Sequence, residues 1–257
     1  MLLVIDSGNT NTVFAIAQNN KIIKQWRINT NIKRTADEYS VWFIKLLEIE
    51  NLKLASISSC IIASVVPEVL LQIKIFNEKY LNTIPMIIGD INVDLGININ
   101  IDTPSEAGAD RLVNAVAVNK FYNKPGIVVD FGTATTFDVV SKHGHYEGGV
   151  IAPGINLSLE ALYMAASRLP RIGIDEPYYK SVIGKNTKDS MRSGIYWGYI
   201  SLIEGIIKRI KKETKTNSIV IATGGLSNLF SKDCSAIQLV DEDLTIKGLV
   251  HIFNINN

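Results

Sequence analysis

The sequence predicts an α/β protein made of two similar halves, and two observations support this fold class. First, the segments LLVIDSGNTNTVFAIAQ and GIVVDFGTATTFDVVSK share one form, in which an acidic glycine turn joins two apolar runs. Second, apolar residues recur at helical spacing in the stretches that follow each segment. Strands that alternate with helices are typical of α/β folds, and a repeated segment indicates duplication.

The first repeated segment predicts a β-hairpin that turns at Asp6, and the second predicts one that turns at Asp130. The two turns are 130 − 6 = 124 residues apart, close to half of the 257 residues. The same offset aligns Val4 with Val128, Gly8 with Gly132 and Thr12 with Thr136.

The rest of the first half predicts three helices. Thr35 and Glu38 form a capping-box sequence at the start of one helix, and Pro67 stands where a second could begin. A third helix is expected after Gly-Ala-Asp-Arg at 108–111, and a break in the chain follows before Gly126. We therefore expect an N-terminal domain over residues 1–121 and a C-terminal domain over residues 122–257.

The second half repeats this mixture of strands and helices. A helix is expected after Gly154, and a longer one from about Thr187 to Lys212. The run Ser-Ile-Val-Ile-Ala-Thr-Gly-Gly at 218–225 predicts a strand that ends in a glycine turn. Two similar domains of this kind would leave a cleft between them.

Composition limits the function classes. The chain is 47% hydrophobic and 20% charged, and its net charge of +1 provides no field that recruits nucleic acid or an anionic membrane. Cys60 and Cys234 lack metal-ligand spacing, which favours a reducing compartment. The N-terminus does not resemble a signal peptide, and no apolar run reaches the ~18 residues of a membrane span. We expect a cytoplasmic protein with no nucleic-acid or membrane partner.

The two hairpin turns are candidates for binding phosphates. Glycines at 8 and 132 allow unusual φ and expose N–H groups, and threonines at 10, 12, 133 and 135 add hydroxyl donors. Asp6 and Asp130 lie at strand ends, where a carboxylate suits Mg²⁺. The alternative is a pair of tight hairpins in which Asp and Asn cap their own turns. No P-loop sequence is present.

A second candidate site lies at residues 106–111, Glu-Ala-Gly-Ala-Asp-Arg. A carboxylate such as that of Asp110 could accept the proton of a phosphoryl acceptor, and Arg111 could bind a carboxylate with two hydrogen bonds. The alternative is that both residues lie in the first turn of a helix, where Asp interacts favourably with the helix dipole, and have no role in catalysis. The glycine pair at 224–225 could admit an adenosine ring, or it could be a plain turn.

As a set, the motifs DSGNTNT, SSCIIASVVP, EAGADR, VVDFGTATTFDVV, GGVIAPG and ATGG resemble type III pantothenate kinases in order and spacing, over nearly the whole chain. The resemblance implies two duplicated ribonuclease-H-like domains of the actin/sugar-kinase/Hsp70 superfold, with an ATP cleft between them. It also implies phosphorylation of pantothenate to 4′-phosphopantothenate, the first step of coenzyme A biosynthesis. ATP, Mg²⁺, a monovalent cation such as K⁺ or NH₄⁺, and a homodimer are implied as well.

The resemblance also assigns roles to individual residues. Asp110 resembles the general base, and it shares the substrate-binding role with Gly108, Ala109, Arg111 and Thr187. Asp130 resembles a ligand of the monovalent cation, and Asp6 the acid near Mg²⁺. The ATP-binding set that the resemblance implies is Asp6, Ser7, Gly8, Asn9, Thr10, Asn11, Thr12, Val13 and Thr133.

One position departs from the family pattern. Ile101 stands where many relatives have a tyrosine, and the change removes a hydroxyl from the expected substrate pocket. This departure leaves open a kinase that acts on another small hydroxylated acid. A regulatory binding protein of the same fold is a further alternative, although no basic stripe or helix-turn-helix signal accompanies the acidic residues.

Overall fold

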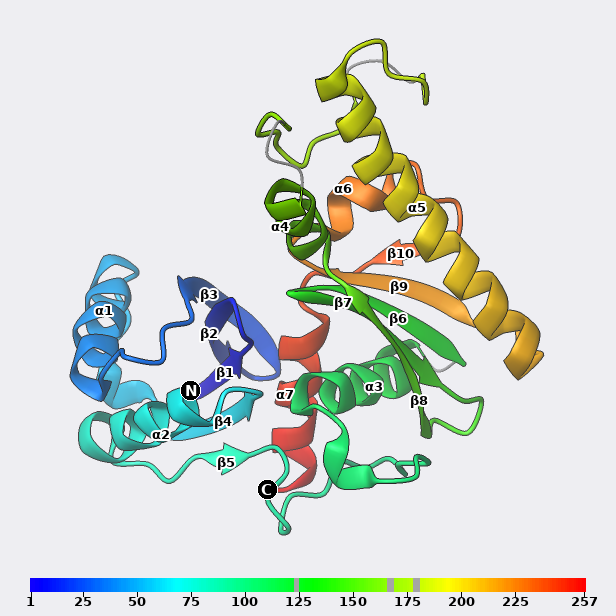
Figure 1. Ribbon diagram of the computed structural model, residues 1–257. Coiled ribbons are helices and arrows are strands. Elements are labelled where there is room, and N and C mark those ends of the chain that lie inside the picture. Colours follow the sequence, from blue (N-terminus) through cyan, green and yellow to red (C-terminus); the bar gives the residue numbers. More distant parts are fainter. Residues whose placement is uncertain (123–124, 166–168, 178–180) are drawn as a thin grey trace. The chain divides into compact units, whose positions relative to one another are not determined.

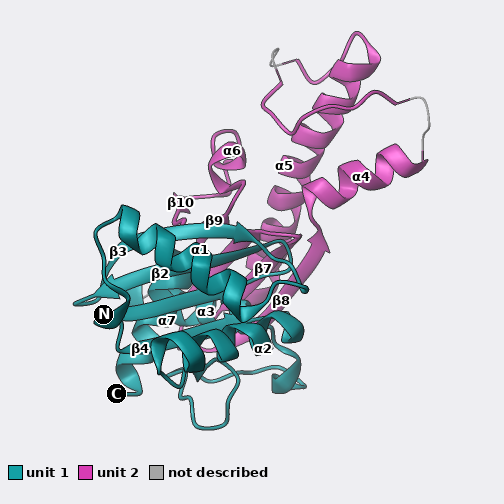
Figure 2. Cartoon of the chain, turned by 90° about the vertical axis from the view of Figure 1, so that its left-hand side faces the viewer, with its two compact units in different colours: residues 1–122, 243–257 teal, residues 123–242 magenta. Residues whose placement is uncertain are grey.

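The computed structural model describes residues 1–122, 125–165, 169–177 and 181–257, which form two compact units. Unit 1 comprises Met1–Tyr122 together with Asp243–Asn257, and unit 2 comprises Asn123–Glu242 (Figure 2). The first 121 residues were expected to form one domain and the remainder the other. The structure differs in that the C-terminal helix packs with unit 1.

Unit 1 contains a five-stranded sheet in the order β3-β2-β1-β4-β5. Strand β1 lies at its centre, antiparallel to β2 and parallel to β4 (Figure 1). The strands span Leu2–Ser7 (β1), Asn11–Gln18 (β2), Lys21–Asn29 (β3), Ser59–Ser64 (β4) and Met86–Ile87 (β5). Strand β3 is not evident from the sequence, because most of its residues are exposed and its apolar residues do not form a run.

Helices cover both faces of this sheet. Successive residues of a strand point to opposite faces, so each strand packs with helices on both sides. Leu3, Ile5 and Phe14 pack with helices α1 and α2, whereas Val4 and Ala15 pack with α3 and α7. The helices span Ala36–Ile49 (α1), Pro67–Phe76 (α2), Ala109–Tyr122 (α3) and Leu244–Ile255 (α7).

Local signals explain where the first two helices begin. Thr35 Oγ1 accepts a hydrogen bond from the Glu38 amide at 3.3 Å, and a Glu38 carboxylate oxygen accepts one from the Thr35 amide at 2.8 Å. The predicted capping box is therefore confirmed. Pro67 is the first residue of α2, where its missing N–H has no helical partner to lose.

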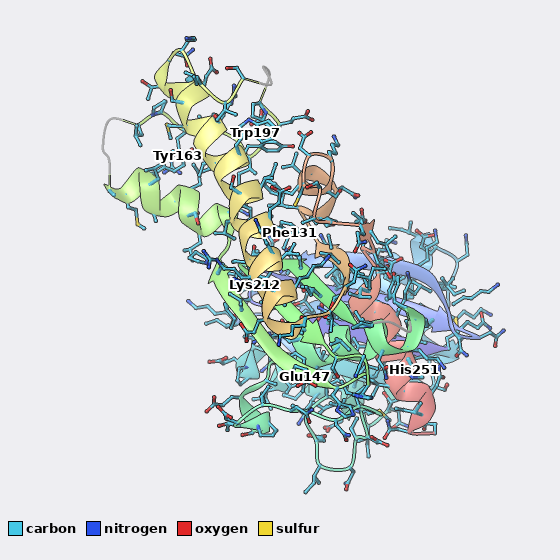
Figure 3. The ribbon with its side chains drawn as sticks, turned by 90° about the vertical axis from the view of Figure 1, so that its right-hand side faces the viewer. Phe131, Glu147, Tyr163, Trp197, Lys212 and His251 are labelled. Carbon is cyan, nitrogen blue, oxygen red and sulfur yellow. The ribbon has the colours of Figure 1, made fainter. Side chains whose placement is uncertain are left out.

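Unit 2 contains a second five-stranded sheet, in the order β10-β9-β6-β7-β8. Phe131 at the end of its central strand, labelled in Figure 3, stacks on Phe230 of α6 with ring centroids 5.5 Å apart. The elements span Gly126–Phe131 (β6), Ala134–Val140 (β7), Tyr146–Pro153 (β8), Ile155–Ala165 (α4), Thr187–Thr214 (α5), Ile219–Gly224 (β9), Ser227–Ser231 (α6) and Leu239–Val240 (β10).

The two sheets have the same topology. In each, the central strand is antiparallel to the strand that follows it and parallel to a later strand, and a short parallel strand lies beyond. The predicted duplication and the duplicated α/β fold class are confirmed. Among the helices of the described residues, none has both the length and the apolar character that crossing a bilayer would require.

Candidate active site

The turn of unit 1 joins β1 to β2 in register, with Asp6 opposite Val13 and Ser7 opposite Thr12. The Gly8 N–H donates a hydrogen bond to the Asn11 carbonyl at 3.0 Å and closes the turn. Asn9 and Thr10 are exposed at its tip. In this conformation the tip can present main-chain and side-chain donors to a ligand.

Glycine was expected in these turns because it allows an unusual backbone φ, and this expectation is wrong. Gly8 and Gly132 both have backbone φ outside the left-handed region. A Cβ added to Gly8 would lie 3.4 Å from the Asn11 carbonyl oxygen, which is an ordinary contact. The fold alone therefore tolerates a side chain at position 8, which leaves close approach of a ligand as a reason for glycine there.

The turn of unit 2 is one residue shorter than that of unit 1. Its Gly132 N–H donates to the Ala134 carbonyl at 3.0 Å, and Phe131 lies opposite Thr135. The structural counterpart of Thr12 is therefore Thr135, so the alignment of Thr12 with Thr136 is wrong beyond the glycine. Thr12 and Thr135 both have side chains that are buried among protein groups.

Two further glycines allow chain segments to pack closely on the unit 2 turn. A Cβ on Gly154 would lie 2.1 Å from the Thr133 carbonyl oxygen. Gly224 has a φ of +87°, and its Cβ would lie 2.6 Å from Asp130 Oδ1. The sequence indicates only a glycine-rich turn near Gly154. Its close packing against Thr133 joins residues that are distant in the sequence, so the sequence does not show it.

Tyr199 of helix α5 is a site neighbour that the sequence did not reveal. Its hydroxyl hydrogen-bonds with that of Thr135 and also donates to the Pro153 carbonyl at 3.2 Å. Tyr199 thereby links the start of β7 to the end of β8. A tyrosine within a long apolar helical pattern is expected to be a core residue, so no sequence signal distinguishes Tyr199 from its buried neighbours.

Asp110 lies in the first turn of α3, in unit 1. Its Oδ1 accepts a hydrogen bond from the Arg111 amide at 2.8 Å, and a Cβ on Gly108 would lie 2.7 Å from this oxygen. Burial raises the pKa of the Asp110 carboxyl above its usual value of 3.8, although the amide and charge of Arg111 partly oppose this rise. A carboxyl with a raised pKa is suited to accepting a proton.

The start of α3 also lies close to the carboxyl end of β4. The same Cβ on Gly108 would lie 3.7 Å from the Val65 side chain, and the Val65 N–H donates to the Ser7 carbonyl at 3.1 Å. Since β4 runs parallel to β1, Asp110 and Asp6 both lie toward the carboxyl ends of these two strands in unit 1. The region beyond the carboxyl ends of parallel strands is where α/β proteins bind ligands.

Thr187 belongs to unit 2, where it is the first residue of α5. Asn186 caps this helix by accepting a hydrogen bond from the Asp189 amide at 3.0 Å. Thr187 is exposed, so its hydroxyl is accessible at the helix N-terminus. Its relation to Gly108, Ala109 and Arg111 stays a prediction.

The family model for type III pantothenate kinase matches residues 2–209. The chain belongs to the type III pantothenate kinase family. It is 53% identical to a type III pantothenate kinase of Paramagnetospirillum magneticum, over 100% of this chain and 98% of that protein. It is also 53% identical to a type III pantothenate kinase of Rhodospirillum rubrum, over 100% of this chain and 99% of that protein.

Solved structures are similar to this chain in fold. An inorganic polyphosphate/ATP-glucomannokinase from an Arthrobacter species is 13% identical to the chain. The match covers 100% of this chain and 99% of that protein, with a TM-score of 0.52. A protein from Campylobacter jejuni assigned to the Baf family of transcriptional activators is 20% identical, covers 99% of the chain and 98% of itself, and has a TM-score of 0.61. At these identities the likeness shows the fold alone.

Proposed function

We propose that this protein transfers the γ-phosphoryl group of ATP to the primary hydroxyl of pantothenate and forms 4′-phosphopantothenate, the first step of coenzyme A biosynthesis. The observation that carries the proposal is Asp110, a carboxylate with a raised pKa at the start of α3 in a chain of this kinase family. A cytoplasmic location is consistent with this biosynthetic role.

The proposed ATP-binding residues form the unit 1 turn from Asp6 to Val13, with Thr133 in the matching turn of unit 2. Thr12 is buried, so it contributes to ATP binding by holding the turn rather than through a free hydroxyl. Asn9 and Thr10 are exposed and can donate to phosphate oxygens directly.

Asp110 is the proposed general base, which accepts the proton of the pantothenate hydroxyl as the oxygen attacks the γ-phosphorus. The bond between that phosphorus and the β–γ bridging oxygen breaks, and ADP leaves. Arg111 is proposed to bind the pantothenate carboxylate, with Gly108, Ala109 and Thr187 beside the substrate. Most of the rate enhancement comes from positioning and charge neutralisation, as is general for phosphoryl transfer.

Membership of the kinase family implies ATP and a divalent metal ion, and the acidic residues fit this requirement. Asp6 offers a carboxylate at the end of β1, and Mg²⁺ is commonly bound by one or two carboxylates together with substrate phosphates. Magnesium would neutralise phosphate charge during transfer. Asp130, with Gly224 close to its carboxylate, is the proposed ligand of a monovalent cation, K⁺ or NH₄⁺.

A homodimer is proposed as the working assembly. Unit 2 exposes several large apolar side chains on β8 and α4, among them Ile151 at 63% and Met164 at 81% exposure. We propose that these side chains contribute to the dimer contact, because a large exposed apolar patch is typical of a surface that binds another protein. Light scattering of the purified protein at two concentrations tests the dimer.

A kinase for another small hydroxylated acid is the second candidate function, and Ile101 favours it. An isoleucine offers no hydroxyl to hydrogen-bond a polar acceptor. Replacement of Ile101 by Tyr separates the candidates, because only a pantothenate-specific pocket is expected to gain affinity for pantothenate from the restored hydroxyl.

An acceptor panel tests the proposed function. Purified protein with ATP, Mg²⁺ and K⁺ is assayed for ADP formation with pantothenate, with other small hydroxylated acids, and with no acceptor. We expect turnover with pantothenate and a lower rate when K⁺ and NH₄⁺ are omitted. ADP formation with a different acid alone would transfer the assignment to that acid, and DNA retention without ADP formation would favour the regulatory alternative.

A further inference from the structure

We propose that Thr30 is a positioning residue, whose hydroxyl fixes the unit 1 turn in the conformation that binds ATP phosphates. The inference rests on the proposed function of that turn. Thr30 follows the last residue of β3 and is 22 positions beyond Gly8 in the sequence. It belongs to none of the motifs that carried the family resemblance.

Thr30 makes two hydrogen bonds to the turn through different atoms. Its hydroxyl donates to the Gly8 carbonyl at 2.7 Å, and its backbone N–H donates to the Thr10 carbonyl at 2.9 Å. Both carbonyl oxygens carry partial negative charge, which would repel a phosphate that they faced. Binding both to Thr30 holds them against the end of β3 and away from a polyanionic ligand.

The hydroxyl of Thr30 also ends a chain of three hydroxyl groups. Thr12 Oγ1 lies 2.9 Å from Thr30 Oγ1 and 3.1 Å from Ser7 Oγ. Each hydroxyl has one proton to donate, and that of Thr30 is donated to Gly8. Thr12 therefore donates to Thr30, and Ser7 donates to Thr12. All three bonds run in one direction toward the Gly8 carbonyl, so each strengthens the next.

Burial protects this chain from exchange with water. Ser7 is 1% exposed and Thr12 is 0% exposed, and Thr30 is half-buried. Hydrogen bonds that water does not replace hold their geometry, which is the property that a preset phosphate site requires. In the matching turn of unit 2, the hydroxyl of Thr135, the counterpart of Thr12, is hydrogen-bonded by Tyr199 of helix α5.

The test replaces Thr30 by Val, which has the same shape and lacks only the hydroxyl, and by Ser, which keeps it. Thr83→Val is the matched control, because its partly buried hydroxyl bonds Asn77 at 3.4 Å, outside this chain of hydroxyls. The readouts are the KM for ATP, the KM for pantothenate, kcat, and the affinity for a non-hydrolysable ATP analogue by calorimetry. Thermal unfolding of each variant checks that it is folded.

We expect Thr30→Val to raise the KM for ATP and the Kd for the analogue about three- to tenfold, the size expected from one lost hydrogen bond. The KM for pantothenate stays within about twofold, Thr30→Ser restores ATP affinity, and Thr83→Val leaves it unchanged. Thr30→Ala removes the same hydroxyl and replaces Thr30→Val should the latter not fold.

Folded Thr30→Val with wild-type ATP affinity overturns the positioning role, and so does an equal change in both KM values. Failure of both Val and Ala variants to fold also overturns it, because the hydroxyl then serves stability alone. If the wild-type protein binds the analogue but does not phosphorylate pantothenate, the proposed function fails while the calorimetry still decides the role of Thr30. A wild-type protein that binds no nucleotide overturns both.

Discussion

At the scale of single residues, Asp110 has conflicting requirements. The proposed base must be ionised to accept a proton, yet burial disfavours its ionised form and raises its pKa. Because the folded-state pKa is above the unfolded value, this residue adds most stability at low pH. That contribution is lost as the pH rises through the folded-state pKa. Function is therefore maintained at the expense of stability at neutral pH.

Asp110→Asn is expected to lower kcat by about 100-fold or more, the range for loss of a general base. It should retain ATP binding and unfold at higher urea concentration than the wild type at pH 7, because the neutral amide is not penalised by burial. The stability gain should disappear at a pH below the ordinary carboxyl pKa of 3.8. Near-wild-type turnover by the folded variant would remove Asp110 from the mechanism.

The pH dependence of the wild-type enzyme provides a second test at this residue. The active carboxylate is protonated as the pH falls, so kcat/KM for pantothenate should decline on the acid side with an apparent pKa above 3.8. A rate profile measured with a stability control at each pH shows this limb. A rate that stays constant down to pH 4 in the folded protein contradicts a base with a raised pKa.

Gly8→Ala separates the fold from ligand binding. A Cβ at this position makes only an ordinary contact of 3.4 Å, so the free energy of unfolding should change by less than about 0.5 kcal/mol. If phosphates approach the main chain here, the methyl group should raise the KM for ATP about tenfold or more, equivalent to about 1.4 kcal/mol. Unchanged ATP affinity would mean that the turn does not bind phosphates.

At the scale of secondary structure, the sequence predicted most elements because their signals are local. The capping box at Thr35, the proline at position 67 and the acidic glycine turns all depend on neighbours within a few residues. The one-residue difference in length between the two turns could not be predicted from the sequence, because only the pairing of residues across the strands reveals it. Thr30 and Tyr199 were missed because their partners are distant in the chain.

Two helical glycines are expected to respond to alanine in opposite ways. A Cβ on Gly248 of α7 would lie 2.4 Å from the Val113 carbonyl oxygen of α3, so Gly248→Ala should destabilise unit 1 by about 1–3 kcal/mol. A Cβ on Gly194 of α5 would meet nothing within 4 Å, so Gly194→Ala should stabilise by up to about 1 kcal/mol.

Urea unfolding curves for the two variants measure both changes. Stabilisation by Gly248→Ala would contradict the close contact between α7 and α3. Destabilisation by Gly194→Ala would indicate that this face of α5 is covered, as it would be in a homodimer interface that includes Gly194.

At the scale of the whole molecule, the duplication was predictable and the assignment of α7 was not. Helix α7 is the last element of the chain, yet Ile246, Leu249 and Ile252 are buried in the core of unit 1. Its contacts span more than a hundred residues, for example the hydrogen bond from Thr245 to Asn114. Sequence periodicity identifies an amphipathic helix but does not specify which sheet it covers.

Phosphoryl transfer to pantothenate is measured by following a labelled γ-phosphate from ATP to product in one reaction with pantothenate and Mg²⁺. We expect label in 4′-phosphopantothenate, one equivalent of ADP for each product formed, and loss of transfer in Asp110→Asn. Label released as inorganic phosphate at the same rate with and without pantothenate would contradict this expectation.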